Sequence, residues 1–446
     1  MLGSIPTELV EVRRVSESVG MGVFTTQAIP ACQVVYQDRP LVSIQHTANR
    51  RFVKACQNCH KPLGSIRDQF ATIFSEERFS HVNLSVLPDG NNVMQHCSCG
   101  EAYCSLDCAS DAYDRHHYCL CVAGVGEYAQ AVSDFKFYCL SIEGCGDNLI
   151  LLAQLIGTVA SRAQGNFTNF ENMIGELLTF TNRPFNEVAR PPSGAERDSD
   201  WQAWLESTIG EAFELMRLAF MGQNEVFARF FENKNRAFDT LSRLLSVFEL
   251  NNIDISIPSG LGESVRELAS SGVQLDPILR EKEVVMRALW NDEAKGVYED
   301  DEDEEEDESM DDEGGDDHSG HCHDDHDEDG YVEELLEGLR EQVQDLSTQE
   351  LLDCEYPNFH GTGFFVSVAR TNHSCDPNVT MDFESGNAVV SCRTVRPVTC
   401  GEELRMSYIS NPAAKRYDTR KAQLSDYLFT CVCPLCEAQA PAPPSH

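Results

Sequence analysis

Apolar and polar residues follow two different periods along this chain of 446 residues. In the stretches Glu211–Phe231, Ala237–Leu250 and Tyr331–Leu352, apolar residues recur every three to four positions. That spacing places them on one face of an amphipathic helix. The sequence therefore predicts a mainly helical segment between residues 147 and 296, and a further helix that begins close to residue 331.

Short β-prone runs lie near both ends of the chain, and turn residues separate them. The runs are Gly22–Thr26, Val34–Tyr36, Gly363–Val368, Ala388–Cys392 and Leu404–Tyr408. Many short strands with turns between them are typical of a β-rich domain built of small sheets. We expect one such domain, whose two halves are separated in the sequence by the helical segment.

Length and hydrophobic content limit the class of protein. With 41% hydrophobic residues the chain can bury a sizeable core, and its length indicates about two to four domains. Residues Met1–Arg14 contain no apolar core of a signal peptide. The longest apolar stretch, around Leu149–Ala160, is too short and too interrupted to span a bilayer. We expect neither a secreted disulfide scaffold nor a membrane protein, and no membrane partner.

The charge of the chain is strongly negative and unevenly distributed. The formal net charge is −39, which argues against direct nucleic-acid binding and favours basic partners. The block Glu299–Asp329 alone holds 20 of the 73 acidic residues. Such a block repels itself and cannot bury apolar surface, so we expect a disordered acidic loop. It is either a solvated linker or a loose site for a soft metal, since it contains His318, His321, Cys322, His323 and His326.

The chain contains 19 cysteines, and metal binding is the usual role of clustered cysteines outside secreted proteins. Zinc requires four ligands in a tetrahedron, and a close pair supplies two of them from one tight turn. In an interleaved arrangement, one zinc takes Cys56, Cys59, Cys104 and Cys108. The other takes Cys97, Cys99, His117 and Cys121. Three neighbours leave alternatives open: His96 in place of Cys97, and His116 or Cys119 near the last pair.

A third group, Cys431, Cys433 and Cys436, offers three ligands and needs a fourth from elsewhere in the chain. The segment Asn372-His373-Ser374-Cys375-Asp376-Pro377-Asn378 resembles the signature of SET-domain lysine methyltransferases. The later run Gly401–Tyr408 and the early run Gly20-Met21-Gly22 resemble two further motifs of that family. The first cysteine series resembles a MYND finger. Together these motifs resemble the SET and MYND domain family of protein-lysine methyltransferases, in the short form without a C-terminal helical domain.

The resemblance implies a fold and a division of the chain. The expected class is α+β, a SET-domain fold of small sheets with a pseudoknot, split by a MYND-type zinc finger and a helical insert. The expected parts are an N-terminal SET part at 8–50, a MYND-like finger at 51–125, a helical insert at 126–296, an acidic loop at 297–330, a catalytic SET part at 331–430 and a zinc segment at 431–446. The gap of 37 residues between Cys59 and Cys97 is longer than in a usual MYND finger.

The resemblance also assigns roles to residues. It implies S-adenosylmethionine as the methyl donor, held by Gly20, Gly22, Asn372, His373, Tyr408 and Phe429. Tyr408 is the expected catalytic residue, which orients the incoming amine at the methyl-transfer pore. Tyr427 and Phe429 are expected to line the substrate lysine channel. Cys375 is the expected fourth ligand of the third site, which completes a set of three structural zinc ions.

The expected function is methylation of lysines in basic proteins, such as a histone tail or a ribosomal protein. An alternative is a catalytically weak scaffold that binds peptide partners through its zinc finger. We expect a monomer in the nucleus, the cytoplasm or both, with a peptide partner at the finger as a further possibility. The intact Asn372, His373 and Tyr408 favour the enzyme over the scaffold.

Overall fold

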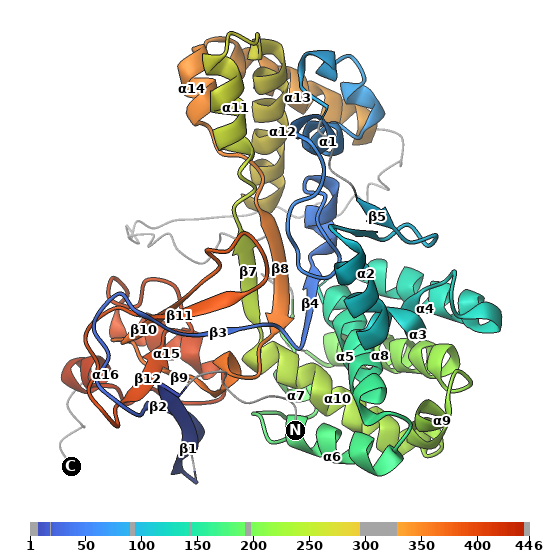
Figure 1. The fold of residues 1–446 in the computed structure, drawn as a ribbon, viewed down its shortest axis with the longest axis vertical. Helices are drawn as coiled ribbons and strands as arrows, with labels where there is room; N and C mark the ends of the chain where they lie inside the picture. The colour runs from blue at the N-terminus through green and yellow to red at the C-terminus, as the bar shows by residue number, and fades with distance from the viewer. Residues whose placement is uncertain are drawn as a thin grey trace, which may run out of the picture.

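A group of small sheets and two groups of helices form the protein; one helical group lies beside the sheets and the other above them in the view of Figure 1. The computed structural model describes residues 8–17, 19–89, 94–142, 144–191, 198–294 and 328–440. The expected acidic loop, up to residue 327, lies outside these residues, and so do its four histidines and Cys322. The mixture of helices and small sheets confirms the α+β class.

Two sheets join strands from the two ends of the chain. The first has the order β1-β2-β12-β9, and the second has the order β10-β11-β3. Their strands are β1 (Val10–Ser16), β2 (Gly20–Thr25), β3 (Val34–Asp38), β9 (Asn372–His373), β10 (Val379–Asp382), β11 (Val390–Thr394) and β12 (Glu403–Met406). Because β2 pairs with β12 and β3 pairs with β11, segments more than 300 residues apart share one core. This pairing confirms the expected β-rich domain with two separated halves.

A third sheet lies between the β-rich domain and the helices (Figure 1). Its order is β4-β8-β7, with β4 at Val42–Gln45, β8 at Phe359–Phe364 and β7 at Ile253–Ile257. Strand β7 falls inside the segment predicted to be helical. Its alternating isoleucines, with Ile255 and Ile257 buried, are the period-two signal that marks a half-buried strand.

The first group of helices contains α4 to α10 and has a large core of its own. The helices are α4 (Ala129–Leu140), α5 (Gly146–Ala163), α6 (Phe167–Leu177), α7 (Phe185–Val188), α8 (Ser199–Phe220), α9 (Glu225–Phe231) and α10 (Lys234–Asn251). Helix α5 contains the longest apolar stretch of the chain and is buried on most of its surface. Among the described residues, no helix has the length and apolar character needed to cross a bilayer.

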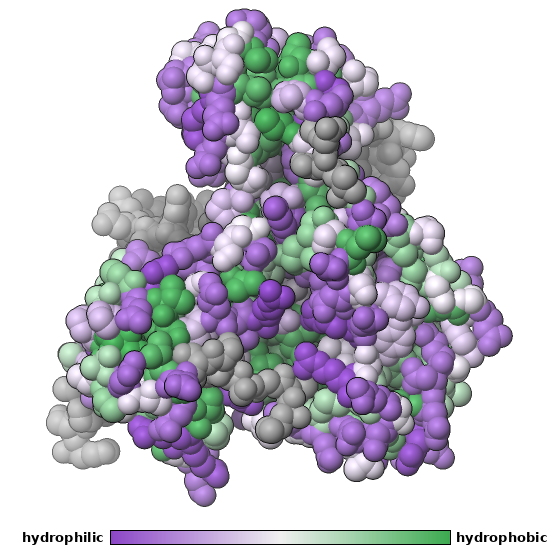
Figure 2. All heavy atoms as spheres, in the orientation of Figure 1, coloured by the Kyte–Doolittle hydropathy of each residue, from purple (hydrophilic) through white to green (hydrophobic). Residues whose placement is uncertain are grey.

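The second group of helices packs around a separate core at the top of Figure 1. It contains α1 (Ile66–Ile73), α11 (Leu261–Ser270), α12 (Asp276–Ala294), α13 (Glu328–Gln344) and α14 (Thr348–Asp353). Helix α1 lies in the long gap between Cys59 and Cys97, and its Phe70 is buried among residues of α11 and α12. The extra length of the expected finger therefore belongs to this core. Hydrophilic residues cover much of the visible face of both groups (Figure 2).

The finger itself consists of short elements around the first cysteine series. They are β5 (Gln95–His96), β6 (Ala102–Tyr103), α2 (Leu106–Ala112) and α3 (Tyr118–Leu120), with a π-helical turn at Tyr113–His117. Two further helices, α15 (Tyr417–Ser425) and α16 (Pro434–Gln439), follow the β-rich domain at its C-terminal end.

Three predicted elements differ in their bounds. The stretch Glu211–Phe231 is two helices, because the Asn224 side chain caps α9 by accepting the N–H of Phe227. The stretch Tyr331–Leu352 is also two helices, because Ser347 and Glu350 form a capping box at the start of α14. The strand predicted at Gly363–Val368 runs instead over Phe359–Phe364, where both β4 and β7 supply backbone partners.

Candidate active site and metal centres

The predicted donor-binding residues Gly22 and Asn372 lie close together, on strands β2 and β9 of one sheet, with β12 between the two strands. The Asn372 side-chain amide donates from Nδ2 to the Met21 carbonyl (3.0 Å) and to Glu403 Oε1 (2.8 Å). Both protons of Nδ2 are thereby used, and Oδ1 is the acceptor available to a ligand. A Cβ on Gly22 would lie 3.1 Å from Asn372 Nδ2 and 2.8 Å from Glu403 Oε1. The missing side chain therefore lets the neighbouring side chains pack directly against the backbone of β2.

His373 connects the predicted catalytic Tyr408 to a cysteine. The Tyr408 backbone N–H donates to His373 Nδ1 (3.0 Å), so the neutral ring carries its proton on Nε2. That Nε2 lies 3.3 Å from the Cys375 sulfur and donates to it. Burial, with the nearby positive charges of Arg405 and Arg420, lowers the pKa of His373 to about 4, which keeps the ring neutral.

Three aromatic rings surround His373 and one another at the end of β12. The Tyr408 hydroxyl donates to the Thr371 carbonyl (2.9 Å), which fixes the direction of the ring. The Tyr427 hydroxyl donates to the Tyr408 carbonyl (3.2 Å), and their ring centroids are 5.3 Å apart. The ring of Phe429 stands edge-on to Tyr408 at 6.1 Å and lies 5.8 Å from His373. The structure thus brings Tyr427 and Phe429 to Tyr408, as predicted for the channel.

Burial governs the acidity of these tyrosines. It raises the pKa of Tyr408, and the charges of Tyr427 and Glu403 raise it further. Burial also raises the pKa of Tyr427. Tyr408 therefore remains a neutral phenol at neutral pH, able to donate one hydrogen bond and accept others.

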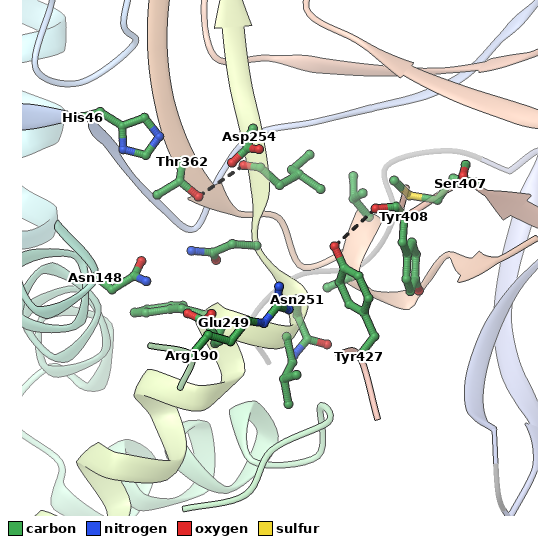
Figure 3. Close-up of a pocket in the computed structure, with 17 residues that line it drawn as sticks. His46, Asn148, Arg190, Glu249, Asn251, Asp254, Thr362, Ser407, Tyr408 and Tyr427 are labelled. Atoms are coloured by element: carbon green, nitrogen blue, oxygen red, sulfur yellow. Dashed lines mark hydrogen bonds between the residues drawn. The ribbon is translucent and has the colours of Figure 1, made fainter. Parts of the chain in front are cut away.

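A cavity of about 400 Å³ opens beside Tyr408 and Tyr427 (Figure 3). Its wall comes from the β-rich domain, from β7 and β8 of the third sheet, and from the C-terminal end of α10. Of the predicted donor-binding residues, only Tyr408 lines it. Gly20, Gly22 and Asn372 are not among the residues that line this cavity.

The charged residues of this cavity are functional candidates that the sequence did not indicate. Glu249 at the end of α10 and Asp254 on β7 line it together with Arg190. Arg190 pairs with Asp426, next to Tyr427, with its Nη1 3.1 Å from Asp426 Oδ2. Burial and the charge of Asp426 raise the pKa of Glu249, while Arg190 opposes this shift. Among these charged residues, only Asp426 could have been suspected from the sequence, because it directly precedes the predicted channel residue Tyr427.

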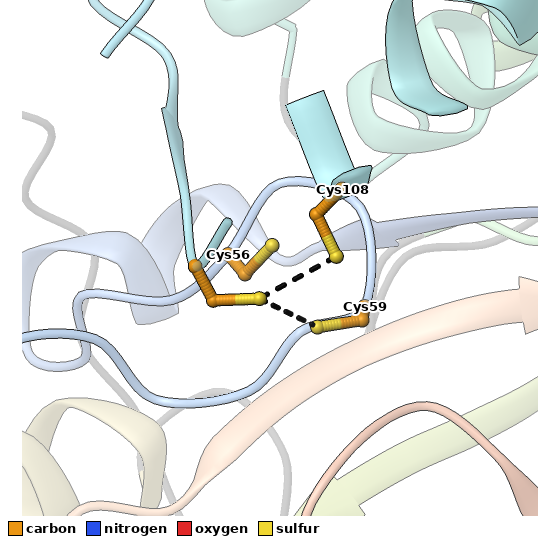
Figure 4. Close-up of side chains that lie close together, drawn as sticks. Cys56, Cys59 and Cys108 are labelled. Atoms are coloured by element: carbon orange, nitrogen blue, oxygen red, sulfur yellow. Dashed lines mark hydrogen bonds between the residues drawn. The ribbon is translucent and has the colours of Figure 1, made fainter. Parts of the chain in front are cut away.

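The first two cysteine groups lie as the interleaved arrangement places them. The ligand atoms of Cys56, Cys59, Cys104 and Cys108 all lie within 4.8 Å of one another, and three of these residues are labelled in Figure 4. The same holds for Cys97, Cys99, His117 and Cys121. Cys104 and Cys108 come together because Ser105 caps α2 and accepts the Cys108 N–H.

The neighbouring residues that the sequence offered as alternative ligands lie outside the two metal groups. His96 is exposed on β5 and is not part of either group, whereas Cys97 is. His116 is buried, and its backbone carbonyl accepts from the thiol of Cys119. In each group, the spacing between ligand atoms suits a tetrahedral ion with bonds of about 2.3 Å to sulfur.

The third group brings Cys375 to the C-terminal trio. The sulfurs of Cys375, Cys431, Cys433 and Cys436 lie within 4.8 Å of one another, and Cys375 is 3.5 Å from Cys436. Tyr408, Tyr427 and Phe429 pack against this group. Its four sulfurs are a donor set that zinc prefers, so all three groups fit structural metal sites.

Comparisons with known proteins identify the domain that holds this site. A model of the SET domain matches residues 270–409, which contain Asn372, His373 and Tyr408. Protein-lysine N-trimethyltransferase SMYD5 of Homo sapiens is 23% identical, over 97% of this chain and 88% of its own length. Histone-lysine N-methyltransferase ATXR2 of Arabidopsis thaliana is 20% identical over 96% of this chain and 90% of its own.

A shorter match is closer in sequence. SET and MYND domain-containing protein DDB_G0292140 of Dictyostelium discoideum is 39% identical over 19% of this chain and 16% of its own length. The chain therefore contains a SET domain, and over nearly its whole length it is similar to the protein-lysine N-trimethyltransferase SMYD5.

Proposed function

We propose that the protein methylates lysine side chains of basic proteins, with S-adenosylmethionine as the donor. The observation that carries this is the position of Tyr408. Its hydroxyl is held by Thr371, its ring is flanked by Tyr427 and Phe429, and a cavity opens beside it. When bound, S-adenosylmethionine supplies an activated methyl group on a good leaving group, so no protein nucleophile is required.

Each residue of the site has a positioning task in this proposal. Gly20, Gly22, Asn372, the His373 backbone and Phe429 hold the donor. Tyr408 and Tyr427 bound the channel and orient the neutral amine toward the methyl group. Exclusion of water from this aromatic channel disfavours the charged ammonium and lowers the pKa of the substrate lysine. Holding the reacting atoms near contact supplies most of the acceleration.

The charges of the cavity support a basic substrate. Glu249 and Asp254 line it, and Arg190, the basic residue there, already pairs with Asp426. The cavity therefore offers carboxylates to the target ammonium or to a basic neighbour in the substrate sequence. Histone tails and basic ribosomal proteins both have this chemistry.

The test is methyl transfer from tritiated S-adenosylmethionine to purified histones, basic ribosomal proteins and an acidic control protein. We expect labelling of basic proteins only, and tandem mass spectrometry would locate the lysine and count its methyl groups. E249Q and D254N should each raise KM for a lysine peptide with basic neighbours, and much less for one with neutral neighbours. Labelling of no substrate by folded, metal-loaded protein, together with no donor binding by calorimetry, would favour the scaffold alternative.

We also propose zinc in the three cysteine groups, with a structural role. All four ligands of each group come from the chain, which closes the coordination sphere as in structural sites. The third site would pin the C-terminal segment that contains Tyr427 and Phe429 against Tyr408. Plasma mass spectrometry of the purified protein should find about three zinc ions per chain.

A peptide partner at the finger has a candidate location. A cavity of about 470 Å³ lies where the finger meets α5 and α9, and Tyr113 and Tyr118 line it. Tyr113 is 49% exposed, so its ring is available to a ligand. We propose that this cavity binds a partner peptide, that the protein is a monomer and that it acts in the nucleus, the cytoplasm or both. Peptide-array binding with Tyr113→Ala, light scattering and cell fractionation test these points in turn.

A further inference from the structure

The third cysteine group has a buried arginine beside it. Arg420, on α15, is 0% exposed and is among the largest fully buried side chains of the described residues. Its Nη1 donates to the Lys415 carbonyl (2.6 Å) and its Nη2 to Gln439 Oε1 (2.7 Å). The same Nη2 lies 3.7 Å from the Cys436 sulfur. The guanidinium is thus directed at a sulfur of the group.

The charge of Arg420 has to be balanced in this buried place. In the part of the chain that the structure describes, its polar contacts are a carbonyl, an amide and a sulfur, and none is a carboxylate. A buried charge without a counter-charge is strongly unfavourable. Four thiolates around a divalent ion would carry a net negative charge, and the guanidinium of Arg420 lies where it can balance that charge.

A second N–H reaches the same group at Cys375. His373 donates from Nε2 to the Cys375 sulfur (3.3 Å), and its Nδ1 accepts the Tyr408 N–H (3.0 Å). Cys375 and Cys436 are themselves 3.5 Å apart. A continuous series of contacts thus runs from Arg420 through the sulfurs and His373 to the Tyr408 backbone.

We propose that Arg420 and His373 are positioning residues that bind the thiolates of the third cysteine group, and that they couple its metal occupancy to the placement of Tyr408. Hydrogen bonds to metal-bound ligands stabilise the bound ion and orient those ligands. Without the ion, the four sulfurs are no longer held together, so α15 and α16 lose a common anchor and the support of Tyr408 through His373 loosens. The proposal concerns metal retention and backbone protection, so it can be tested without methyl transfer.

The test compares R420M, which removes charge and donors, with R420K, which keeps the charge but loses the planar fork. R416M is the matched control, because Arg416 is exposed at the start of the same helix. Each full-length, zinc-loaded protein is exposed to a chelator and pulse-labelled with N-ethylmaleimide. Peptide mass mapping then reports each cysteine group separately, so that the seven cysteine ligands of the finger serve as an internal standard.

In R420M, we expect the four cysteines of the third group to be labelled about 10- to 100-fold faster, the usual effect of losing a partner of a metal ligand. R420K should be intermediate, and R416M should match the wild type. Hydrogen exchange at the Tyr408 amide should rise in R420M in step with metal loss. Unchanged labelling of the third group in R420M would overturn the proposal, and so would unchanged Tyr408 exchange after that group has lost its metal. If R420M does not fold, R420K decides: faster labelling confined to the third group supports the proposal, and wild-type labelling overturns it.

Discussion

The backbone N–H of Tyr408 donates to Nδ1 of His373 across 3.0 Å, and β12 and β9 run parallel up to this point, with Met406 opposite His373. This one bond sets the tautomer of the histidine, since the acceptor nitrogen cannot carry the proton. It also fixes the backbone of Tyr408 just beyond the end of β12. The position of Tyr408 therefore depends on a histidine that is 35 residues away in sequence.

Replacement of His373 by alanine should destabilise the protein. The change leaves the Tyr408 N–H without its acceptor, and an unsatisfied buried donor costs about 1–3 kcal/mol. Urea unfolding should show this loss in the free energy of unfolding. His81→Ala is the control: that side chain is 55% exposed, and its loss should change stability by less than about 0.5 kcal/mol. Equal stability of the two variants would show that the bond to Tyr408 contributes nothing.

Tyr408→Phe should abolish most of the activity with little change in fold. It keeps the ring contacts with Tyr427 and Phe429 but removes the hydroxyl that donates to Thr371. We expect kcat to fall by about 100- to 1,000-fold, as when one oriented polar group is removed from a site. Stability should fall by only about 1 kcal/mol.

The measurement for Tyr408→Phe is radiolabelled methyl transfer, with donor affinity read by calorimetry. Tyr427→Phe serves for comparison, because it loses only the weaker bond to the Tyr408 carbonyl. We expect it to cost less activity than Tyr408→Phe. Undiminished transfer by Tyr408→Phe would remove Tyr408 from the catalytic role.

Gly22→Ala should mainly weaken donor binding, whereas Gly20→Ala should mainly lower the stability of the fold. At Gly22 a new Cβ would lie 2.7 Å from Val15 Cγ2 and 2.8 Å from Glu403 Oε1, so Glu403, which accepts from Asn372, has to shift. We expect donor affinity to fall by about tenfold or more, as for a lost hydrogen bond to a charged ligand group. At Gly20 a Cβ meets nothing within 4 Å, but φ is +82°, so the cost is strain of about 1 kcal/mol. Calorimetry should show the larger loss of donor affinity in Gly22→Ala, and thermal unfolding should show the larger loss of stability in Gly20→Ala.

The pH profile of methyl transfer should rise throughout the range from pH 7 to 10. The reactive form of the substrate lysine is the neutral amine, whose fraction grows with pH. Burial raises the pKa of Tyr408 above its ordinary value of 10.0, so the phenol stays protonated over this range. The expected profile of kcat/KM therefore has a rising limb and no descending limb from Tyr408. A descending limb below pH 9 that disappears in Tyr408→Phe would contradict the raised pKa.

Much of the site follows from short motifs in the sequence. Asn372, His373 and Cys375 lie within four residues, and the three cysteines of the C-terminal group lie within six, so their chemistry is visible locally. The α+β class follows from two different periods in separate parts of the chain. Strand β7 was not predicted, because its alternating isoleucines lie within a segment dominated by helical periodicity. The strand is stabilised by its pairing with β8, which the local sequence does not show.

The sequence by itself determined which residue types carry the chemistry: a glycine-rich turn, an Asn-His pair, a tyrosine and twelve metal-ligand candidates. Only the tertiary structure decided how the cavity is charged and what holds its catalytic tyrosine. Glu249, Asp254 and Asp426 come from the end of α10, from β7 and from the segment after α15, and nothing in their local sequence brings them together. The local sequence likewise gives no sign that Arg420 is buried. Its burial results from the packing of α15 on the third cysteine group. The physical reason is that ligand motifs depend on short-range geometry of the chain, whereas burial and charge balance depend on which distant segments share a core.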